Sequence, residues 1–346
     1  MCGIAGQVGR SARTVQENYQ AFGAMQKTLA RRGPDQRGIY CSGRAALLHT
    51  RLCVIDPENG TQPMQLQWQG ETYVMVYNGE LYNTPELRAA LQSCGHEFAG
   101  HSDTEVLLHA YAQWGSACVE RCNGIFAFAV WAVQQGVLFL ARDRCGVKPL
   151  FYAQRQGGLL FGSELKTLLA HPAVEPKIDA NGLAQIMLLG PGRVPGSGVF
   201  CGVRELLPGQ CAEFDANTGH LSLRRYWYLT DHEHPDDFAA TVRRLRELLL
   251  DAIHRQLVAD VPVASLLSGG LDSSILASVA DAAFVKAGKT LHTFSVGYKD
   301  NKRYFHATKF QPGADAPFIR LMNESLQATH HWVTLDTPQL VQALYR

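Results

Sequence analysis

The chain opens with Met1-Cys2-Gly3-Ile4, and this stretch decides how we interpret the rest of the sequence. Removal of the initiator methionine, which the small side chain of Cys2 permits, would place a thiol and a free α-amino group on one residue. An α-amine has a pKa low enough to take up and return a proton near neutral pH. The thiol would then have a base on its own residue. The alternative is that Cys2 only begins a buried first strand, because Cys-Gly-Ile-Ala is apolar.

Composition limits the classes of function. The 346 residues suggest two domains or one large one, and 46% apolar with 18% charged residues is ordinary for a soluble globular protein. A net charge of +1 without a basic block argues against nucleic-acid binding. No apolar run approaches the roughly 20 residues that cross a bilayer, and no signal peptide is recognisable. The cysteines form neither a disulfide framework nor a zinc spacing, so we expect free thiols in the cytoplasm.

Arg51 ends a strand predicted at residues 46–52. An arginine in this position is more often solvated than functional, although its fork of N–H groups suits the carboxylate of a ligand. The preceding segment is predicted to be a helix over residues 15–31 that stops at a Gly-Pro turn. The turn, Arg-Arg-Gly-Pro-Asp at 31–35, is as consistent with a charged loop as with a site.

A second strand, at residues 72–77, leads directly into Asn78-Gly79-Glu80. Asn-Gly after a strand is commonly a hairpin turn. The functional alternative is an oxyanion hole, in which the Asn78 amide and the Gly79 backbone N–H point toward one position. The sequence alone leaves both interpretations open.

Asp103 lies in Ser102-Asp103-Thr104-Glu105, which has the spacing of a capping box at a helix start. A carboxylate there can simply complement the helix dipole. It can also receive the ammonium group of an amino-acid ligand. Further strands are expected at 125–133 and 137–141 and near Leu159, Val199 and Cys211, which predicts packed sheets with helices outside. A polar stretch at 230–236 marks the expected border between domains.

The most specific motif is Ser268-Gly269-Gly270-Leu271-Asp272-Ser273-Ser274. It follows an apolar stretch at 261–267, which reads as a buried parallel strand, and it precedes a helix. A glycine-rich turn between a strand and a helix presents backbone N–H groups and the helix dipole to a phosphate. The motif is neither a Walker A loop nor a nucleophile elbow, and an ordinary turn would not need these residues.

Only about three parallel strands are expected after residue 260, against the usual five or six in a sheet. They fall at 261–267, 291–297 and 331–335, with a helix near 318–326 and another beginning at Pro338. We therefore expect this second domain to be incomplete, with an exposed edge and part of its nucleotide crevice missing.

With these residues assembled, the chain resembles the glutamine-hydrolysing asparagine synthases, which join a class II glutamine amidotransferase domain to a synthase domain. The resemblance covers essentially the whole chain and rests on many ordered motifs. These are MCGI (1–4), RRGPD (31–35), HTRL (49–52), YNGELYN (77–83), HSDTEV (101–106), RDRCGVKPL (142–150), GSELK (162–166) and LLSGGLDSS (266–274).

For the first domain, residues 2–229, the resemblance implies an N-terminal-nucleophile αββα sandwich. Cys2 is expected to attack the side-chain amide of glutamine and to release ammonia. Asn78 and Gly79 would hold the oxyanion. Arg51 would bind the glutamine carboxylate, and Glu80 and Asp103 would receive its α-amino group.

For the second domain, residues 237–346, the resemblance implies part of an α/β adenine-nucleotide α-hydrolase-like sheet. Residues 268–274 would bind the pyrophosphate of ATP, and Leu266 and Val296 would flank the nucleotide. ATP and Mg²⁺ would activate aspartate as β-aspartyl-AMP, which ammonia converts to asparagine. Family members continue past this point into a second acidic loop that residues 298–346 do not resemble. The residues that would hold the metal, and those that would bind aspartate, stay unassigned.

Two alternatives remain open. The same fold could amidate a carboxylate other than aspartate, or the chain could show glutaminase activity only. The oligomeric state also stays open, a homodimer included.

Overall fold

The computed structural model of this chain describes residues 1–155, 157–190, 192–309 and 313–344. The remaining positions fall within the two predicted domains, 2–229 and 237–346, and lie outside the described residues. The chain divides into two compact units, Met1–His232 and Glu233–Arg346, and each is described by itself.

The first unit contains two six-stranded antiparallel sheets. In the first sheet the strand order is β10-β8-β9-β1-β3-β2. Its strands are β1 (Gly3–Gly9), β2 (Gln36–Ser42), β3 (Ala45–Arg51), β8 (Phe151–Arg155), β9 (Gly158–Gly162) and β10 (Arg204–Glu205). In the second sheet the order is β12-β11-β7-β6-β5-β4. Its strands are β4 (Met64–Trp68), β5 (Glu71–Leu81), β6 (Gly124–Ala132), β7 (Val137–Arg142), β11 (Gln210–Asp215) and β12 (His220–Arg225).

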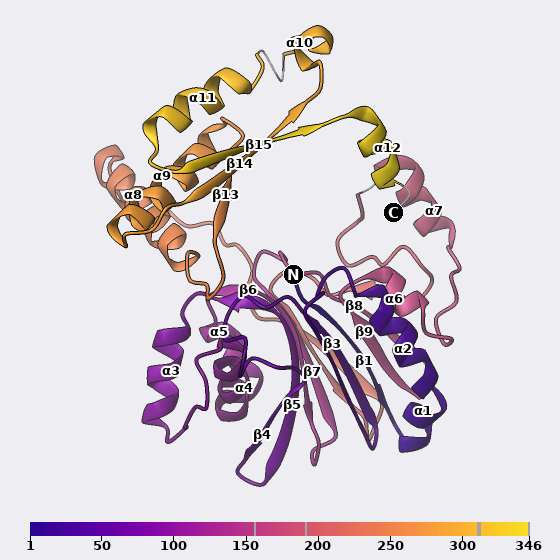
Figure 1. The fold of residues 1–346 in the computed structure, drawn as a ribbon. Coiled ribbons are helices and arrows are strands. Elements are labelled where there is room, and N and C mark those ends of the chain that lie inside the picture. Colours follow the sequence, from indigo (N-terminus) through magenta and orange to yellow (C-terminus); the bar gives the residue numbers. More distant parts are fainter. Residues whose placement is uncertain (156, 191, 310–312, 345–346) are drawn as a thin grey trace. The chain divides into compact units, whose positions relative to one another are not determined.

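Helices cover the outer face of each sheet, as Figure 1 shows. Beside the first sheet lie α1 (Ala12–Glu17), α2 (Tyr19–Thr28) and α6 (Leu165–Leu169). Beside the second lie α3 (Thr84–Ser93), α4 (Asp103–Trp114), the 3₁₀ turn η1 (Gly115–Ala117) and α5 (Cys118–Arg121). The first unit also contains α7 (Ala180–Leu189).

Three buried clusters hold these layers together. The cluster between the two sheets contains Ile4, Val76 and Phe161. The two outer clusters join each sheet to its helices, for example through Phe22 of α2 and Leu107 of α4. Because side chains alternate across a strand, Val74 and Val76 face the other sheet, whereas Met75 and Tyr77 face α4. The predicted αββα sandwich is confirmed.

The Asn78-Gly79 pair is part of a strand. β5 continues to Leu81, and Asn78 and Gly79 pair with Ala127 and Phe126 of β6. The hairpin-turn interpretation is therefore wrong, because the neighbouring strand supplies ladder partners that a propensity for turns does not anticipate. Asn78 shares the orientation of Val76 along the strand, so its side chain faces the first sheet.

Two other local expectations differ from the structure. The helix predicted at 15–31 is divided at Asn18 into α1 and α2 and ends at Thr28. No strand forms at Val199, whose backbone has φ 66° in the left-handed region, and only its neighbour Phe200 makes an isolated bridge, to Ile178. A β-branched residue with positive φ cannot continue a regular strand.

The second unit contains a three-stranded parallel sheet, β13-β14-β15. Its strands are β13 (Ala264–Leu266), β14 (His292–Tyr298) and β15 (Thr329–Leu335). Its helices are α8 (Phe238–Arg255), α9 (Leu271–Lys286), α10 (Asn301–Tyr304), α11 (Ala316–Ser325) and α12 (Thr337–Leu344).

The buried strand predicted at 261–267 is shorter and more exposed than expected. β13 has only three residues, and Leu266 is 75% exposed. β13 is the edge of the described sheet and pairs only with β14, so one side of the strand has no neighbour to cover it.

In the described part of the chain, no helix has the length and apolar character needed to span a membrane.

Candidate functional site

A small cavity of about 90 Å³ lies at the beginning of β1 in the first unit. It contains all six residues that the sequence selected for this unit: Cys2, Arg51, Asn78, Gly79, Glu80 and Asp103. They come from the start of β1, the end of β3, the end of β5 and the first turn of α4. Its other lining residues are Met1, Leu52, Val54, Ile55, Gln62, Tyr77, Thr104 and Lys148.

Cys2 is held beside the end of β3, because Gly3 of β1 pairs with Thr50. The backbone N–H of Leu52 donates to the Cys2 Sγ at 3.4 Å, and the thiol lies 3.7 Å from the Leu52 carbonyl oxygen. Burial raises the pKa of the Cys2 thiol, and burial also lowers the pKa of the Met1 α-amine. The thiol therefore keeps its proton near neutral pH unless a base removes it, and a terminal amine with a lowered pKa is suited to do so.

Asn78 supplies an unused hydrogen-bond donor. The residue is 1% exposed, and its buried Nδ2 has no hydrogen-bond partner within the part of the chain that the structure describes. An unpaired buried donor costs about 1–3 kcal/mol, so its presence beside Cys2 points to a ligand that completes it. At Gly79, a Cβ would lie 2.3 Å from the Ile125 carbonyl oxygen, and only glycine fits this close approach to β6.

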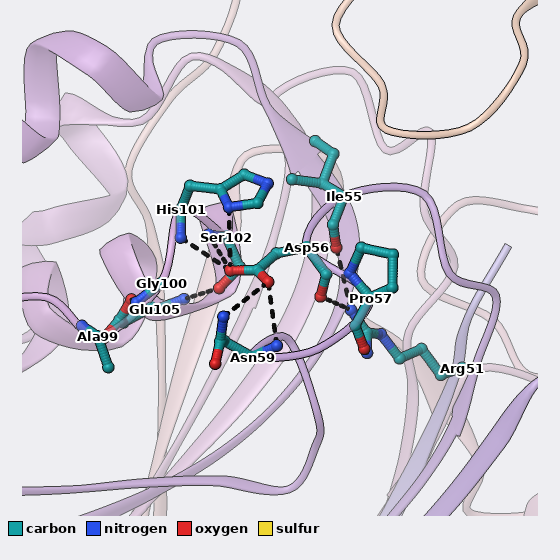
Figure 2. Close-up of polar contacts among 10 residues, drawn as sticks. All are labelled: Arg51, Ile55, Asp56, Pro57, Asn59, Ala99, Gly100, His101, Ser102 and Glu105. Carbon is teal, nitrogen blue, oxygen red and sulfur yellow. Dashed lines mark hydrogen bonds and ion pairs between the residues drawn. The ribbon is translucent and has the colours of Figure 1, made fainter.

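Arg51 holds the loop that follows its own strand. Its Nη1 donates to Gln36 Oε1 at 2.9 Å and to the Pro57 carbonyl at 3.0 Å. Its Nη2 donates to the carbonyls of Ile55 and Asp56 at 3.0 and 2.6 Å (Figure 2). These four acceptors are neutral oxygens. They satisfy the guanidinium hydrogen bonds without cancelling its positive charge.

Asp103 is a buried carboxylate that β5 positions. Its Oδ2 accepts from Tyr77 Oη at 2.9 Å and from the Leu81 backbone N–H at 3.1 Å. Burial raises the pKa of Asp103 to about 6, although these two hydrogen bonds act in the opposite direction. Burial also raises the pKa of Glu80, and the positive charge of Lys148 opposes that change. The cavity thus combines two carboxyl groups with the ammonium of Lys148.

Sequence reasoning did not assign a role to several cavity residues. Gln62 accepts from the Tyr77 backbone N–H at 2.6 Å and donates to Thr104 Oγ1 at 3.2 Å, so it joins β5 to α4. No local pattern marks Gln62, because its partners are distant in the chain. Lys148 lies in the 142–150 motif, and that motif was its only available signal. Asp143, in the same motif, holds this loop by accepting from the N–H groups of Phe126 and Lys148.

The seven-residue motif 268–274 of the second unit spans the turn after β13 and the first turn of α9, whose first residue is Leu271. Its serine side chains hydrogen-bond within the loop. Ser273 Oγ accepts from the Ser268 N–H at 3.2 Å and donates to the Gly270 carbonyl, which Ser274 Oγ also contacts at 2.8 Å. A helix N-terminus with hydroxyl groups around it is suited to bind an anion.

The remaining residues selected for this unit lie in the same motif, at the end of the strand before it, or on the neighbouring strand. Leu266 ends β13, Gly269 lies within the turn, Asp272 is in the first turn of α9, and Val296 lies on β14, which pairs with β13. Leu266, Leu271 and Val296 have exposed side chains. Over the described residues, no group of three or more histidine, cysteine, aspartate or glutamate side chains is arranged to hold a metal ion.

Comparison with known proteins agrees with both units. The model of the glutamine amidotransferase domain matches residues 1–227, and the asparagine synthase model matches residues 244–346. The chain is 46% identical over 345 residues to asparagine synthetase [glutamine-hydrolyzing] 3 of Bacillus subtilis strain 168, covering 99% of this chain and 56% of the relative. It is 35% identical over 310 residues to asparagine synthetase [glutamine-hydrolyzing] 2 of the same organism, covering 86% and 40%. The chain thus spans about half the length of these relatives.

A solved structure shares the fold. It is an allosteric regulatory enzyme of purine biosynthesis, with a TM-score of 0.50 and 16% identity, covering 96% of this chain and 80% of that one. A cysteine at the head of an αββα sandwich, facing a buried amide donor, defines the class of N-terminal-nucleophile glutamine amidotransferases. Within that class, the chain belongs to the glutamine-hydrolysing asparagine synthetase family.

Proposed function

We propose that the first unit, as a domain of residues 2–229, hydrolyses glutamine to glutamate and ammonia. The observation that carries this proposal is the buried, unpaired Asn78 Nδ2 in the same cavity as the Cys2 thiol. An amide donor without a partner, next to a nucleophile, is the arrangement that stabilises an oxyanion.

The reaction uses Cys2 as nucleophile. Sγ bonds to the side-chain amide carbon of glutamine, and the thiol proton passes to the α-amine that methionine removal leaves on Cys2. Asn78 Nδ2 and the Gly79 N–H stabilise the oxygen that becomes negative. The carbon–nitrogen bond then breaks, ammonia leaves with the proton returned by the amine, and water hydrolyses the thioester to glutamate.

Three charged side chains of the cavity recognise the amino-acid end of glutamine. The four hydrogen-bond acceptors of Arg51 are neutral and leave its positive charge in place, which supports an electrostatic role with the substrate carboxylate. Glu80 and Asp103 receive the α-ammonium group. Burial raises the pKa of both carboxyl groups, so their ionised forms are costly in the empty cavity. A positively charged ammonium group stabilises those ionised forms, and the cavity therefore favours a substrate that carries this group.

We propose that the second unit is part of a synthase domain, residues 237–346, that binds ATP at Ser268, Gly269, Gly270, Leu271, Asp272, Ser273 and Ser274, with Leu266 and Val296 beside the nucleotide. The helix N-terminus of α9 and the serine hydroxyls of the loop fit a polyphosphate. The complete reaction of the family would join the ammonia to ATP-activated aspartate and give asparagine, AMP and pyrophosphate.

Mg²⁺ would enter this site as part of the ATP complex. Asp272 is the carboxylate of the loop, and the phosphates themselves supply the other oxygen ligands that Mg²⁺ prefers. The ion would neutralise phosphate charge when bound.

We also propose a cytoplasmic location, which nine free cysteines support because disulfides are rare in that compartment.

The test separates the two units. Purified chain is given glutamine, and glutamate release is measured for the wild type, Cys2→Ala and, as a matched control, Cys41→Ala at an exposed position of β2. Cys2→Ala should abolish release while Cys41→Ala should not. Unchanged release by Cys2→Ala would refute the nucleophile.

Pyrophosphate release from MgATP is then measured with aspartate, without it, and with other carboxylic acids. Release that depends on aspartate supports the synthase proposal. Release that requires a different acid would identify another acceptor, and no release would leave glutaminase activity as the function of this chain.

A further inference from the structure

Asp56 connects two walls of the Cys2 cavity that are distant in sequence. Leu52, Val54 and Ile55 form one wall, and Asp103 and Thr104 form another. Asp56 lies immediately after the first group and is 1% exposed. Its side chain reaches across to the segment that precedes α4, as Figure 2 shows.

The Asp56 carboxylate accepts hydrogen bonds with both oxygens. Oδ1 accepts from the Asn59 backbone N–H at 3.0 Å and from Asn59 Nδ2 at 3.1 Å. Oδ2 accepts from the backbone N–H groups of His101 and Ser102 at 2.7 and 3.1 Å, and it lies 3.5 Å from His101 Nδ1. Burial raises the pKa of Asp56, but the hydrogen bonds from Asn59 and His101 outweigh it and hold that pKa below its usual value.

The bond to Ser102 replaces half of the capping box expected from the sequence. In a capping box, the glutamate three residues into the helix accepts from the N–H of the capping residue. Here Ser102 Oγ does accept from the Glu105 N–H at 3.2 Å, but the Glu105 carboxylate reaches back to the N–H groups of Ala99 and Gly100. Asp56 therefore takes the position that Glu105 leaves open and completes the cap of the helix that carries Asp103.

The opposite side of Asp56 is also held. Its carbonyl oxygen accepts from Arg51 Nη2 at 2.6 Å. The packing around its carboxylate is tight, because a Cβ on Gly100 would lie 2.3 Å from Asp56 Oδ2 and 2.7 Å from the Asn59 Cβ. One residue thus bonds to Arg51 through its backbone and to the start of α4 through its side chain.

We propose that Asp56 is a positioning residue for the amino-acid end of glutamine, an inference that rests on the glutaminase function proposed above. It fixes the distance between Arg51 and Asp103, the two groups that would bind the substrate carboxylate and ammonium. It does not contact the reacting atoms. Loss of its charge therefore weakens the recognition of glutamine and leaves the intrinsic reactivity of the Cys2 thiol intact.

The test is Asp56→Asn, which keeps the size of the side chain but replaces one acceptor oxygen with an NH₂ group. We expect the KM for glutamine to rise at least about tenfold, because a buried charge-assisted bond to backbone donors is lost. We expect kcat to stay within about threefold. Asp215→Asn is the matched control, because Asp215 also accepts from a backbone N–H, that of Asn217, at the β11–β12 turn.

A second readout separates positioning from general damage. The rate at which 6-diazo-5-oxo-L-norleucine, a reactive analogue with the amino-acid end of glutamine, labels Cys2 should fall in Asp56→Asn. The rate with iodoacetamide, which lacks that end, should stay at the wild-type value when peptide mass spectrometry follows Cys2. If Asp56→Asn does not fold, Gly100→Ala serves, since its new methyl group displaces the Asp56 carboxylate, and it should raise the KM in the same way.

A wild-type KM in Asp56→Asn, or an equal fall in labelling by both reagents, would overturn the positioning role. In the second case the substitution would have damaged the whole site. If the proposed function itself is wrong, the result differs: the wild-type chain would release no glutamate.

Discussion

Tyr77→Phe should shift the pH dependence of glutamine use. The substitution removes the hydroxyl that donates to Asp103 Oδ2 at 2.9 Å in a buried site and changes little else in the volume of the side chain. That hydrogen bond favours the ionised carboxylate. In the proposed binding mode, the ionised Asp103 carboxylate receives the substrate ammonium, so binding is present above its pKa and is lost as the pH falls through it. Removing the bond raises the pKa and moves that loss toward neutral pH.

The size of the effect follows from the environment of Asp103. The carboxyl group has a pKa of about 6, so about a tenth of it is protonated at pH 7. A hydrogen bond to a charged group contributes about 1.5–3 kcal/mol, which corresponds to a rise in the pKa of about one to two pH units. Between half and nine-tenths of Asp103 would then be protonated at pH 7. The KM for glutamine should rise about 2- to 10-fold at pH 7 and less than about 1.5-fold at pH 8.5.

The assay is glutamate release as a function of glutamine concentration at pH 6, 7, 8 and 8.5. Tyr73→Phe is the control, because Tyr73 lies on the same strand with the same orientation and packs edge-on against Tyr111. Its pH profile should match the wild type. A KM in Tyr77→Phe that rises equally at every pH would refute the reasoning, since it would show lost packing rather than a shifted titration.

Three further predictions concern other parts of the chain. Asn78→Ala should lower kcat for glutamine hydrolysis by about 10²- to 10³-fold with a smaller change in KM; a change confined to KM in steady-state assays would argue against an oxyanion role. Phe161→Ala, in the cluster between the sheets, should lower the free energy of unfolding by about 3–5 kcal/mol, and a denaturant midpoint equal to that of the wild type would contradict this. Ser273→Ala should weaken ATP binding about 5- to 10-fold in calorimetric titration, because a loop hydroxyl is removed; unchanged affinity would move the phosphates away from this loop.

Packed sheets with helices outside could be predicted because the strand and helix signals are local, whereas the αββα order of the layers came from the family resemblance. A continuous apolar run, as at Val74, Met75, Val76 and Tyr77, indicates a strand with two buried faces. The cavity residues could be selected in advance because they lie in motifs that resemble those of a known family; residue type alone left a structural alternative open for Cys2, Asn78 and Asp103.

Other features depend on partners that are distant in the sequence. Asn78-Gly79 has a strong turn propensity, but pairing with β6 keeps it in a strand. The capping box at Ser102 was predicted, whereas the reach of Asp56 over 46 positions to complete it was not. The apolar stretch before the 268–274 loop reads as buried, yet Leu266 is exposed because the described sheet has no strand beyond β13. The local propensity of a segment does not indicate which strands or side chains from elsewhere in the sequence lie beside it.

The proposed nucleophile and the amide donor come from different sheets: Cys2 precedes β1 in the first, and Asn78 lies on β5 in the second. The distance between the two groups therefore depends on the separation of the two sheets, and the side chains packed between the sheets set that separation. The cluster between the sheets includes Ile4, which is two residues from Cys2, and Val76, which is two residues from Asn78. Because close-packed interiors transmit small changes in volume, an interior methyl group far from any substrate can alter the reach of the thiol. The side chains between the sheets thus have two roles: they hold the layers together, and they maintain the distance between Cys2 and Asn78.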